Sequence, residues 1–198
     1  MTVATATAAT PDPIARLSVE QYHKMIQAGI FTDDDRVELL EGLLVQKMSK
    51  NPPHRVSTNL VTESLRSVVP MGWYVDSQEP ITTGTSEPEP DVAIIRGRTR
   101  DYTDRHPGPD DIALVVEVAD ASIEMDQRTK QRVYASAGIA IYWIVNLNER
   151  RVQVYTRPSG PAEEPGYGHR QDVAAGESMP VIVGGKEVGQ IAVADILP

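Results

Sequence analysis

The sequence contains no cysteine and only four histidines. Without cysteine the chain has no disulfide bond, no thiolate metal site and no cysteine nucleophile, a composition that fits a reducing cytoplasm. So few histidines make a histidine-rich zinc site unexpected. A metal ion would instead be held mainly by oxygen atoms, which are the ligands that Mg²⁺ and Mn²⁺ prefer.

Long apolar segments are also missing. Hydrophobic residues make up 40% of the chain, but no run approaches the roughly 20 residues that a membrane-spanning helix requires. The first residues lack the positive start and the long apolar stretch of a secretory signal. We therefore expect residues 1–16 to be a disordered tail and residues 17–198 to form a single domain with one hydrophobic core.

Positive charge is scarce. Lysine and arginine total 19 against 28 aspartate and glutamate residues, which gives a net charge of −9. Nucleic-acid-binding proteins usually carry a basic surface, so this balance counts against such a partner. A local basic stripe, together with carboxylates that serve as metal ligands, would reconcile the charge with that partner.

Hydrophobic periodicity predicts three helices, over residues 17–30, 54–69 and 120–137. Ser18 is placed to cap the first helix, and Gly138 to end the last. Short alternating or continuous apolar segments predict strands over residues 36–48, 73–81, 91–95, 112–118, 141–146 and 151–156.

Three of these strands carry more detailed expectations. Residues 36–48 form a hairpin that turns near Glu41-Gly42, and residues 112–118 form a central strand covered on both faces. Residues 151–156 form an edge strand, followed by a loop to residue 170 and short peripheral strands from about residue 173. The order of elements predicts a mixed α/β domain with a central sheet.

Two carboxylates occupy neighbouring apolar strands. Asp91 opens the strand in EPDVAII, and Glu117 lies near the end of IALVVEV. A carboxylate buried in a strand costs several kcal/mol unless it is paired or bound to a metal ion. Taken singly, each is more often solvated at a strand end or paired with arginine. Taken together they indicate a site for a divalent cation, which would remove their mutual repulsion.

The helix after Glu117 carries three further candidates. Asp126, Lys130 and Tyr134 follow one another at intervals of four residues, so they share one helical face. An Asp–Lys pair at this spacing is commonly a surface salt bridge. Directly after a candidate metal strand, Lys130 could instead return to the site to position a water molecule or stabilise charge on a phosphoryl oxygen.

Two other residues leave two interpretations open. Glu38 alternates with apolar neighbours in the first hairpin strand, so it faces solvent or provides a third acidic ligand. His54 begins the second helix, where a surface histidine is the more common case and a contact to phosphate the more specific one. Arginines at positions 96, 98 and 100 form a solvated loop or grip a phosphate backbone.

These residues lie in motifs that resemble those of a known family. The strings RVELLEG, EPDVAII and LVVEVADAS, followed by D-x-x-x-K-x-x-x-Y-A-x-A-G-I, occur in the order typical of the Uma-two family, described as "putative restriction endonucleases". That family belongs to the PD-(D/E)XK nuclease superfamily. The resemblance runs from about Leu17 to Tyr155 and implies a restriction-endonuclease-like fold, a mixed sheet flanked by helices, preceded here by the N-terminal helix and hairpin.

The resemblance also implies roles for residues. Pro90-Asp91 matches the "PD" of the superfamily, and Glu117-Val118-Ala119 matches "(D/E)XK" with alanine in place of lysine. Lys130 would then supply the amine. Asp91, Glu117, the Val118 carbonyl and Glu38 would bind Mg²⁺ or Mn²⁺. Asp126 and Tyr134 would support the site.

The sequence thus predicts a metal-dependent endonuclease that hydrolyses phosphodiester bonds in DNA and acts as a homodimer, since a double-strand cut needs two sites. Ala119 and the negative charge motivate an alternative, a non-catalytic nucleic-acid-binding or regulatory module on the same fold. A third interpretation, a structural dimerisation protein, rests on the apolar strand 141–146 and the expected edge strand 151–156. The position of the Lys130 amine relative to Asp91 and Glu117 separates the first interpretation from the second.

Overall fold

The structure is a computed structural model that describes residues 14–198. Most of the expected tail lies outside the described residues, and the assignment of the rest to a single domain stays a prediction. No helix in residues 14–198 combines the length and apolarity needed to cross a lipid bilayer.

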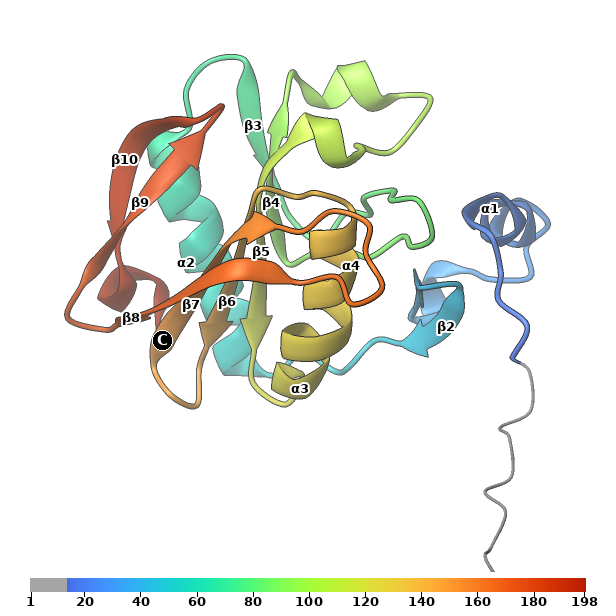
Figure 1. The fold of residues 1–198 in the computed structure, drawn as a ribbon, viewed down its shortest axis with the longest axis horizontal. Coiled ribbons are helices and arrows are strands. Elements are labelled where there is room, and N and C mark those ends of the chain that lie inside the picture. The colour runs from blue at the N-terminus through green and yellow to red at the C-terminus, as the bar shows by residue number, and fades with distance from the viewer. Residues whose placement is uncertain (1–13) are drawn as a thin grey trace, which may run out of the picture.

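A six-stranded sheet in the order β3-β4-β5-β6-β7-β8 forms the centre of the fold (Figure 1). Its strands are β3 (Trp73–Asp76), β4 (Val92–Arg96), β5 (Ile112–Ala119), β6 (Ile141–Asn146), β7 (Arg151–Pro158) and β8 (Tyr167–Ala174). Strands β5 and β6 are parallel, and every other neighbouring pair is antiparallel. All residues of β5 are buried, which confirms the prediction of a central strand covered on both faces.

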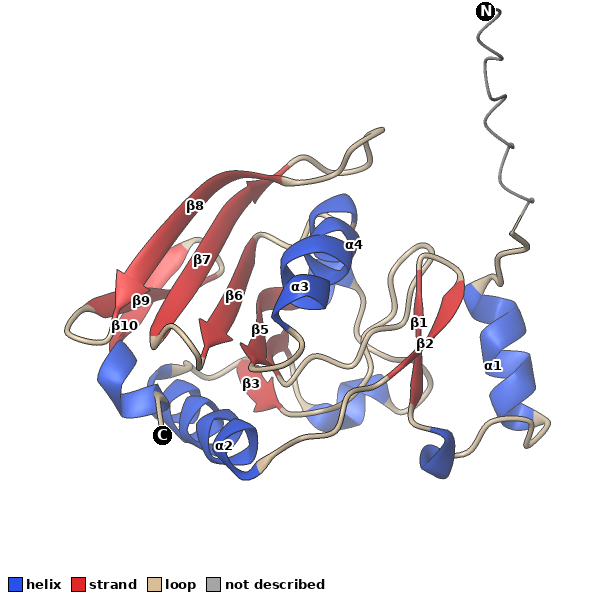
Figure 2. Ribbon diagram, turned by 90° about the horizontal axis from the view of Figure 1, so that it is seen from below, coloured by secondary structure: helices blue, strands red, loops and turns tan. Residues whose placement is uncertain are grey.

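Helices cover both faces of this sheet, so the predicted fold class is confirmed (Figure 2). On one face lies α2 (Pro52–Val68), beside the hairpin of β9 (Ser178–Val183) and β10 (Lys186–Ala192). On the other face lies a helical segment made of α3 (Ile123–Met125), a π-helical stretch (Asp126–Lys130) and α4 (Gln131–Ser136). The predicted single helix over residues 120–137 is therefore shorter and contains a π-helical stretch.

The N-terminal elements lie to one side of the sheet (Figure 1). Helix α1 (Val19–Gln27) is capped by Ser18, as predicted, through a capping box with Gln21. Strands β1 (Val37–Leu40) and β2 (Leu43–Gln46) form the predicted hairpin, whose turn residues Glu41 and Gly42 both have positive φ angles.

Three expectations about the C-terminal third were wrong. Strand β7 is not an edge strand, because it pairs with both β6 and β8, and β8 begins within the expected loop. The elements after residue 173 are not peripheral, since Met179, Val181 and Ile191 are buried in the main apolar core. The apolar strands 141–146 and 151–156 are therefore interior, which removes the observation behind the dimerisation interpretation.

Candidate functional site

Strand alternation places Asp91 and Glu117 on the same face of the sheet. Val92 pairs with Val116 across the antiparallel strands, and continuing this register by one residue sets Asp91 opposite Glu117. Val92 and Val116 pack into the core on the α2 side. Because successive side chains point to opposite faces, the two carboxylates point to the side of α3 and α4.

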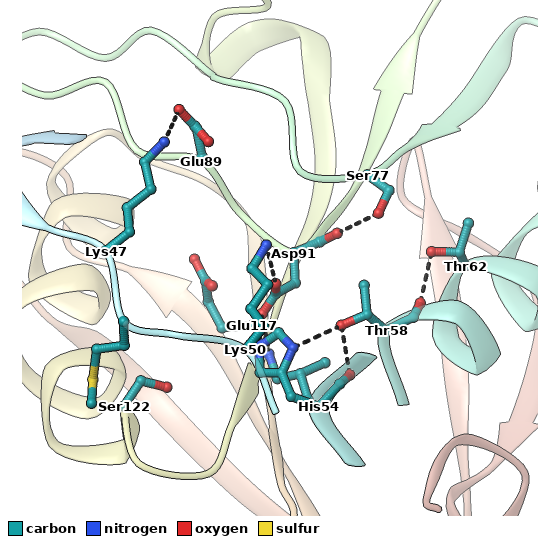
Figure 3. Close-up of polar contacts among 12 residues, drawn as sticks. Lys47, Lys50, His54, Thr58, Thr62, Ser77, Glu89, Asp91, Glu117 and Ser122 are labelled. Carbon is teal, nitrogen blue, oxygen red and sulfur yellow. Dashed lines mark hydrogen bonds and ion pairs between the residues drawn. The ribbon is translucent and has the colours of Figure 1, made fainter. Parts of the chain in front are cut away.

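Asp91 is almost fully buried and has several partners. Its Oδ2 accepts a hydrogen bond of 2.9 Å from the Val118 amide and lies 3.1 Å from Nε2 of His54, while Lys50 Nζ lies 3.7 Å from Oδ1 (Figure 3). Burial opposes ionisation, but the interactions with His54, the Val118 amide and Lys130 together lower the pKa of Asp91 below its ordinary value. Asp91 is therefore held as a carboxylate.

His54 is partly buried, so the interpretation of His54 as a surface histidine was wrong. It lies in the first turn of α2, whose cap is Asn51, and the Asn51 side chain accepts a hydrogen bond of 3.0 Å from the His54 amide. The His54 ring lies between Asp91 and Thr58, with 3.4 Å between its Nδ1 and the Thr58 hydroxyl (Figure 3). The ring orientation is thus set from both sides.

Glu117 is held by side chains of the helical segment that packs on this face of the sheet. Its Oε1 accepts hydrogen bonds from Lys130 Nζ at 2.9 Å and from the Tyr134 hydroxyl at 2.7 Å. The same ammonium lies 3.6 Å from Oε1 of Glu38, which comes from strand β1. Glu38 is only 3% exposed, so of its two interpretations the solvent-facing one was wrong.

Asp126 lies at the start of the π-helical stretch that ends at Lys130. It is buried, and its Oδ2 accepts a hydrogen bond of 2.6 Å from the Ser122 hydroxyl. Such stretches are rare and occur often at functional sites. The structure thus brings Asp126 and Lys130 into the same site as Glu117, rather than onto an exposed helical face.

These residues line a cleft of about 90 Å³. Several other residues that line it were not predicted from the sequence: Lys47, Lys50, Asn51, Glu89 and Ser122. Lys47 pairs with Glu89 at its rim (Figure 3). The cleft therefore carries Lys47, Lys50 and Lys130 and the N-terminus of α2 beside its carboxylates.

The buried carboxylates outnumber the buried cation. Burial raises the pKa of the Glu117 carboxyl well above its ordinary value; Lys130 opposes this rise, whereas Asp126, Asp91 and Glu38 add to it. Burial likewise raises the pKa of Asp126 to about 6. Burial disfavours the ammonium of Lys130, yet three surrounding carboxylates raise its pKa, so it stays charged.

The chemistry of this donor set, which consists of oxygen atoms, suits a divalent cation. Glu38, Asp91, Glu117 and Asp126 are at most 5% exposed and share one buried ammonium, Lys130. An excess of buried carboxylates is unfavourable unless a cation compensates it. Carboxylate and carbonyl oxygens are the ligands that Mg²⁺ and Mn²⁺ take.

The arginines at positions 96, 98 and 100 do not line this cleft. Strand β4 begins directly after Asp91 and ends at Arg96, which carries the following loop to the opposite end of the sheet. The Arg96 guanidinium stacks over Trp73 at 4.9 Å, and Arg98 pairs with Asp101. Their position favours the interpretation of a surface loop.

Comparison with known proteins gives matches to a family model and to solved structures. The model of the Uma2 family, described as "Putative restriction endonuclease", matches residues 19–183. Among solved structures the chain is similar to "a putative nuclease belonging to DUF820" from Anabaena variabilis, with 14% sequence identity and a TM-score of 0.64. That alignment covers 91% of this chain and 97% of the other and concerns the fold. No curated protein sequence matches the chain.

Proposed function

Because the chain belongs to the Uma2 family of "putative restriction endonucleases", we propose that it is a divalent-metal-dependent endonuclease that hydrolyses phosphodiester bonds in DNA. The observation that carries the proposal is the cluster of buried carboxylates around Lys130, with Lys130 Nζ 2.9 Å from Glu117 and 3.6 Å from Glu38. A structural ion pair needs one carboxylate for one ammonium, and this cluster has more.

In this proposal Asp91, Glu117 and the Val118 carbonyl, with Glu38, would hold Mg²⁺ or Mn²⁺. The ion, when bound, supplies a water molecule of lowered pKa and stabilises negative charge on the phosphoryl group. The net reaction adds water to phosphorus and breaks one phosphorus–oxygen ester bond.

The chain's own cations act on the reacting group. The Lys130 ammonium, fixed by Glu117, would orient the attacking water or neutralise charge that develops on a phosphoryl oxygen. Lys50 and the N-terminus of α2 lie at the same cleft and favour an anionic substrate. His54, held by Thr58 and Asp91, would keep Asp91 ionised and correctly placed.

The position of Lys130 favours the enzyme over the alternative, a non-catalytic module on the same fold. Its side chain is 9% exposed and lies among the carboxylates instead of pointing to solvent. Ala119 occupies the position at which the resemblance implied lysine, and Lys130 supplies an amine on the same face. The negative overall charge is consistent with carboxylates kept for a metal ion.

Nicking of supercoiled plasmid in the presence of Mg²⁺ or Mn²⁺ tests the proposal. We expect cleavage by the wild-type protein and its loss in Asp91→Ala and Glu117→Ala, whereas Asp110→Ala, an exposed carboxylate outside the cleft, keeps it. Equal nicking by all four proteins would assign the activity to a contaminant and refute the proposal. So would the absence of Mn²⁺ binding at millimolar concentration.

A double-strand cut requires two such sites, so we propose that the protein acts as a homodimer. Light scattering with and without a DNA duplex tests this. A monomer under both conditions would limit the activity to single-strand nicking.

A further inference from the structure

A second group of metal-ligating side chains lies outside the carboxylate cleft. His23 comes from α1, Glu87 from the segment before β4, and His106 from the loop between β4 and β5. One ligand atom from each lies within 4.8 Å of the others. Among residues 14–198, these three are the histidine and acidic side chains whose ligand atoms come this close together in a group of three or more.

Backbone hydrogen bonds fix the two segments that carry Glu87 and His106. The Thr82 amide donates a hydrogen bond of 2.9 Å to the carbonyl of Pro107, which ties the Glu87 segment to the His106 loop. The Glu87 amide donates one of 2.7 Å to Leu39 of strand β1. Segments far apart in the sequence are thus joined by backbone hydrogen bonds at this point, which places their side chains reproducibly.

Glu87 is a buried carboxylate with a second support. It is 4% exposed, and its Oε2 accepts a hydrogen bond of 2.7 Å from the Thr82 hydroxyl and lies 2.5 Å from Nε2 of His23. Metal-binding carboxylates are commonly held by such an additional hydrogen bond. The His106 ring lies 6.1 Å from the His23 ring, centroid to centroid, and is exposed.

The group opens to solvent through a cleft of its own. This cleft has a volume of about 630 Å³ and is lined by His23, Glu87 and His106 but by none of the residues that line the carboxylate site. An ion can therefore enter from solvent, and a water molecule can complete its coordination.

We propose that His23, Glu87 and His106 form a second metal site that binds a Zn²⁺-class transition-metal ion with water as the fourth ligand. Two imidazoles and one carboxylate are a donor set that zinc takes, whereas Mg²⁺ prefers oxygen alone. Ligand atoms about 2.0–2.2 Å from zinc lie within about 4 Å of one another in a tetrahedral shell. Small side-chain rotations close the observed spacing, and the ion replaces the contact between His23 and Glu87.

The ion would act as a cross-link close to the carboxylate site. Glu87 pairs through its backbone with Leu39, the neighbour of Glu38, and it lies four residues before Asp91. Binding would fix α1 and both segments to each other. The site is separate from the proposed nuclease centre and does not depend on that function.

Titration of the metal-free, full-length protein with Co²⁺, whose visible spectrum reports coordination, tests the proposal directly, with Zn²⁺ as competitor. We expect one Co²⁺ with a four-coordinate spectrum in the wild-type protein and in Asp91→Ala/Glu117→Ala, in which the carboxylate site is removed. His106→Ala and Glu87→Gln should lose the spectrum. His169→Ala, an exposed histidine of β8, should retain it.

A milder variant tests whether the hydrogen bond to Glu87 supports metal binding without disturbing the fold. Thr82→Val removes only the hydrogen bond to Glu87 and should weaken Co²⁺ binding by about 10–100-fold, the usual effect of losing such a partner. Zn²⁺ should also raise the melting temperature of Asp91→Ala/Glu117→Ala, in which the carboxylate site is removed, and leave that of the same protein with His106→Ala added unchanged. His106 is exposed, so this variant is expected to fold normally.

Three results would overturn the proposal. The first is the absence of Co²⁺ and Zn²⁺ binding to the wild-type protein, in which case His23 and Glu87 form an ordinary ion pair. The second is a spectrum that survives in His106→Ala, and the third is one that disappears in Asp91→Ala/Glu117→Ala. A failure of plasmid cleavage would leave these measurements unaffected.

Discussion

Replacing Lys130 by methionine removes the ammonium from the carboxylate cluster while it preserves most of the side-chain volume. In the wild-type protein this ammonium lies 2.9 Å from Glu117 and 3.6 Å from Glu38 and is buried. The variant leaves these carboxylates with no buried cation. Glu117, whose pKa is already raised by burial, then takes up a proton more readily.

The expected loss of stability follows from the burial of the pair. Removing one partner of a buried ion pair costs about 3–5 kcal/mol, and protonation of Glu117 places the value near the lower end. For a chain of this size, 1 kcal/mol shifts the melting temperature by roughly 2–4 °C, so we expect a decrease of about 6–12 °C without metal ions.

Divalent cations should reverse much of this loss. An ion at 100 times its dissociation constant stabilises the folded state by about 2.7 kcal/mol, provided that it binds only that state. In Lys130→Met no ammonium competes with the ion for the carboxylates, so Mg²⁺ should raise its melting temperature by more than that of the wild-type protein. Plasmid cleavage should nevertheless be lost, because the proposed catalytic amine is gone.

Thermal unfolding followed by circular dichroism, with Mg²⁺ or with a chelator, measures both effects. Lys186→Met, at an exposed lysine of β10, is the matched control and should melt as the wild-type protein does. Our interpretation is refuted if Lys130→Met also melts like the wild-type protein in chelator. It is equally refuted if Mg²⁺ stabilises Lys130→Met less than the wild-type protein.

Two further predictions concern the elements around the site. The Arg132 guanidinium donates two hydrogen bonds to the Glu41 carboxylate. This hydrogen bonding is the largest of the effects that lower the pKa of Glu41 below its ordinary value. Because the pKa is lower in the folded state, the interaction stabilises the folded protein at pH values above the pKa of Glu41 in the unfolded chain. This stabilisation is lost as the pH falls through the pKa of Glu41 in the folded state. Arg132→Met should therefore cost about 0.2–1 kcal/mol in urea unfolding at neutral pH, and a cost that persists in strong acid would contradict this. Gly42 and Gly138 share a φ of 78°, but a Cβ at Gly42 would lie 2.9 Å from the Leu17 carbonyl, whereas Gly138 has open space. Gly42→Ala should thus lower the melting temperature more than Gly138→Ala, and equal decreases would show that φ alone sets the cost.

The part of the fold that could be predicted is the part with an apolar pattern. Strand β5 was predictable as a doubly covered strand because all its residues are buried. Strand β8 was not, since it lies at the sheet edge and most of its residues are exposed, as in the polar run His169–Asp172. A polar edge strand and a polar loop look alike in sequence, and only pairing with β7 distinguishes them.

Some residues of the candidate site could be predicted from the sequence, and others could not. Asp91 and Glu117 could be predicted because each places a charge in an apolar strand, where it is costly. The environments of Glu38 and His54 could not, because both depend on how distant elements pack. Glu38 is buried by the docking of the hairpin onto the segment before β4, where the Glu89 amide donates a hydrogen bond to it.

The position of the amine on a helix changes what the site depends on. A lysine at position 119 would be fixed by the sheet itself, but Ala119 is fully buried in the cluster that packs the sheet against the helical segment. Lys130 reaches Glu117 only if this segment docks on the sheet, and Tyr134, also hydrogen-bonded to Glu117, docks with it. The proposed catalytic group is therefore positioned by tertiary packing. Loss of packing between the helical segment and the sheet should impair activity before the sheet itself unfolds.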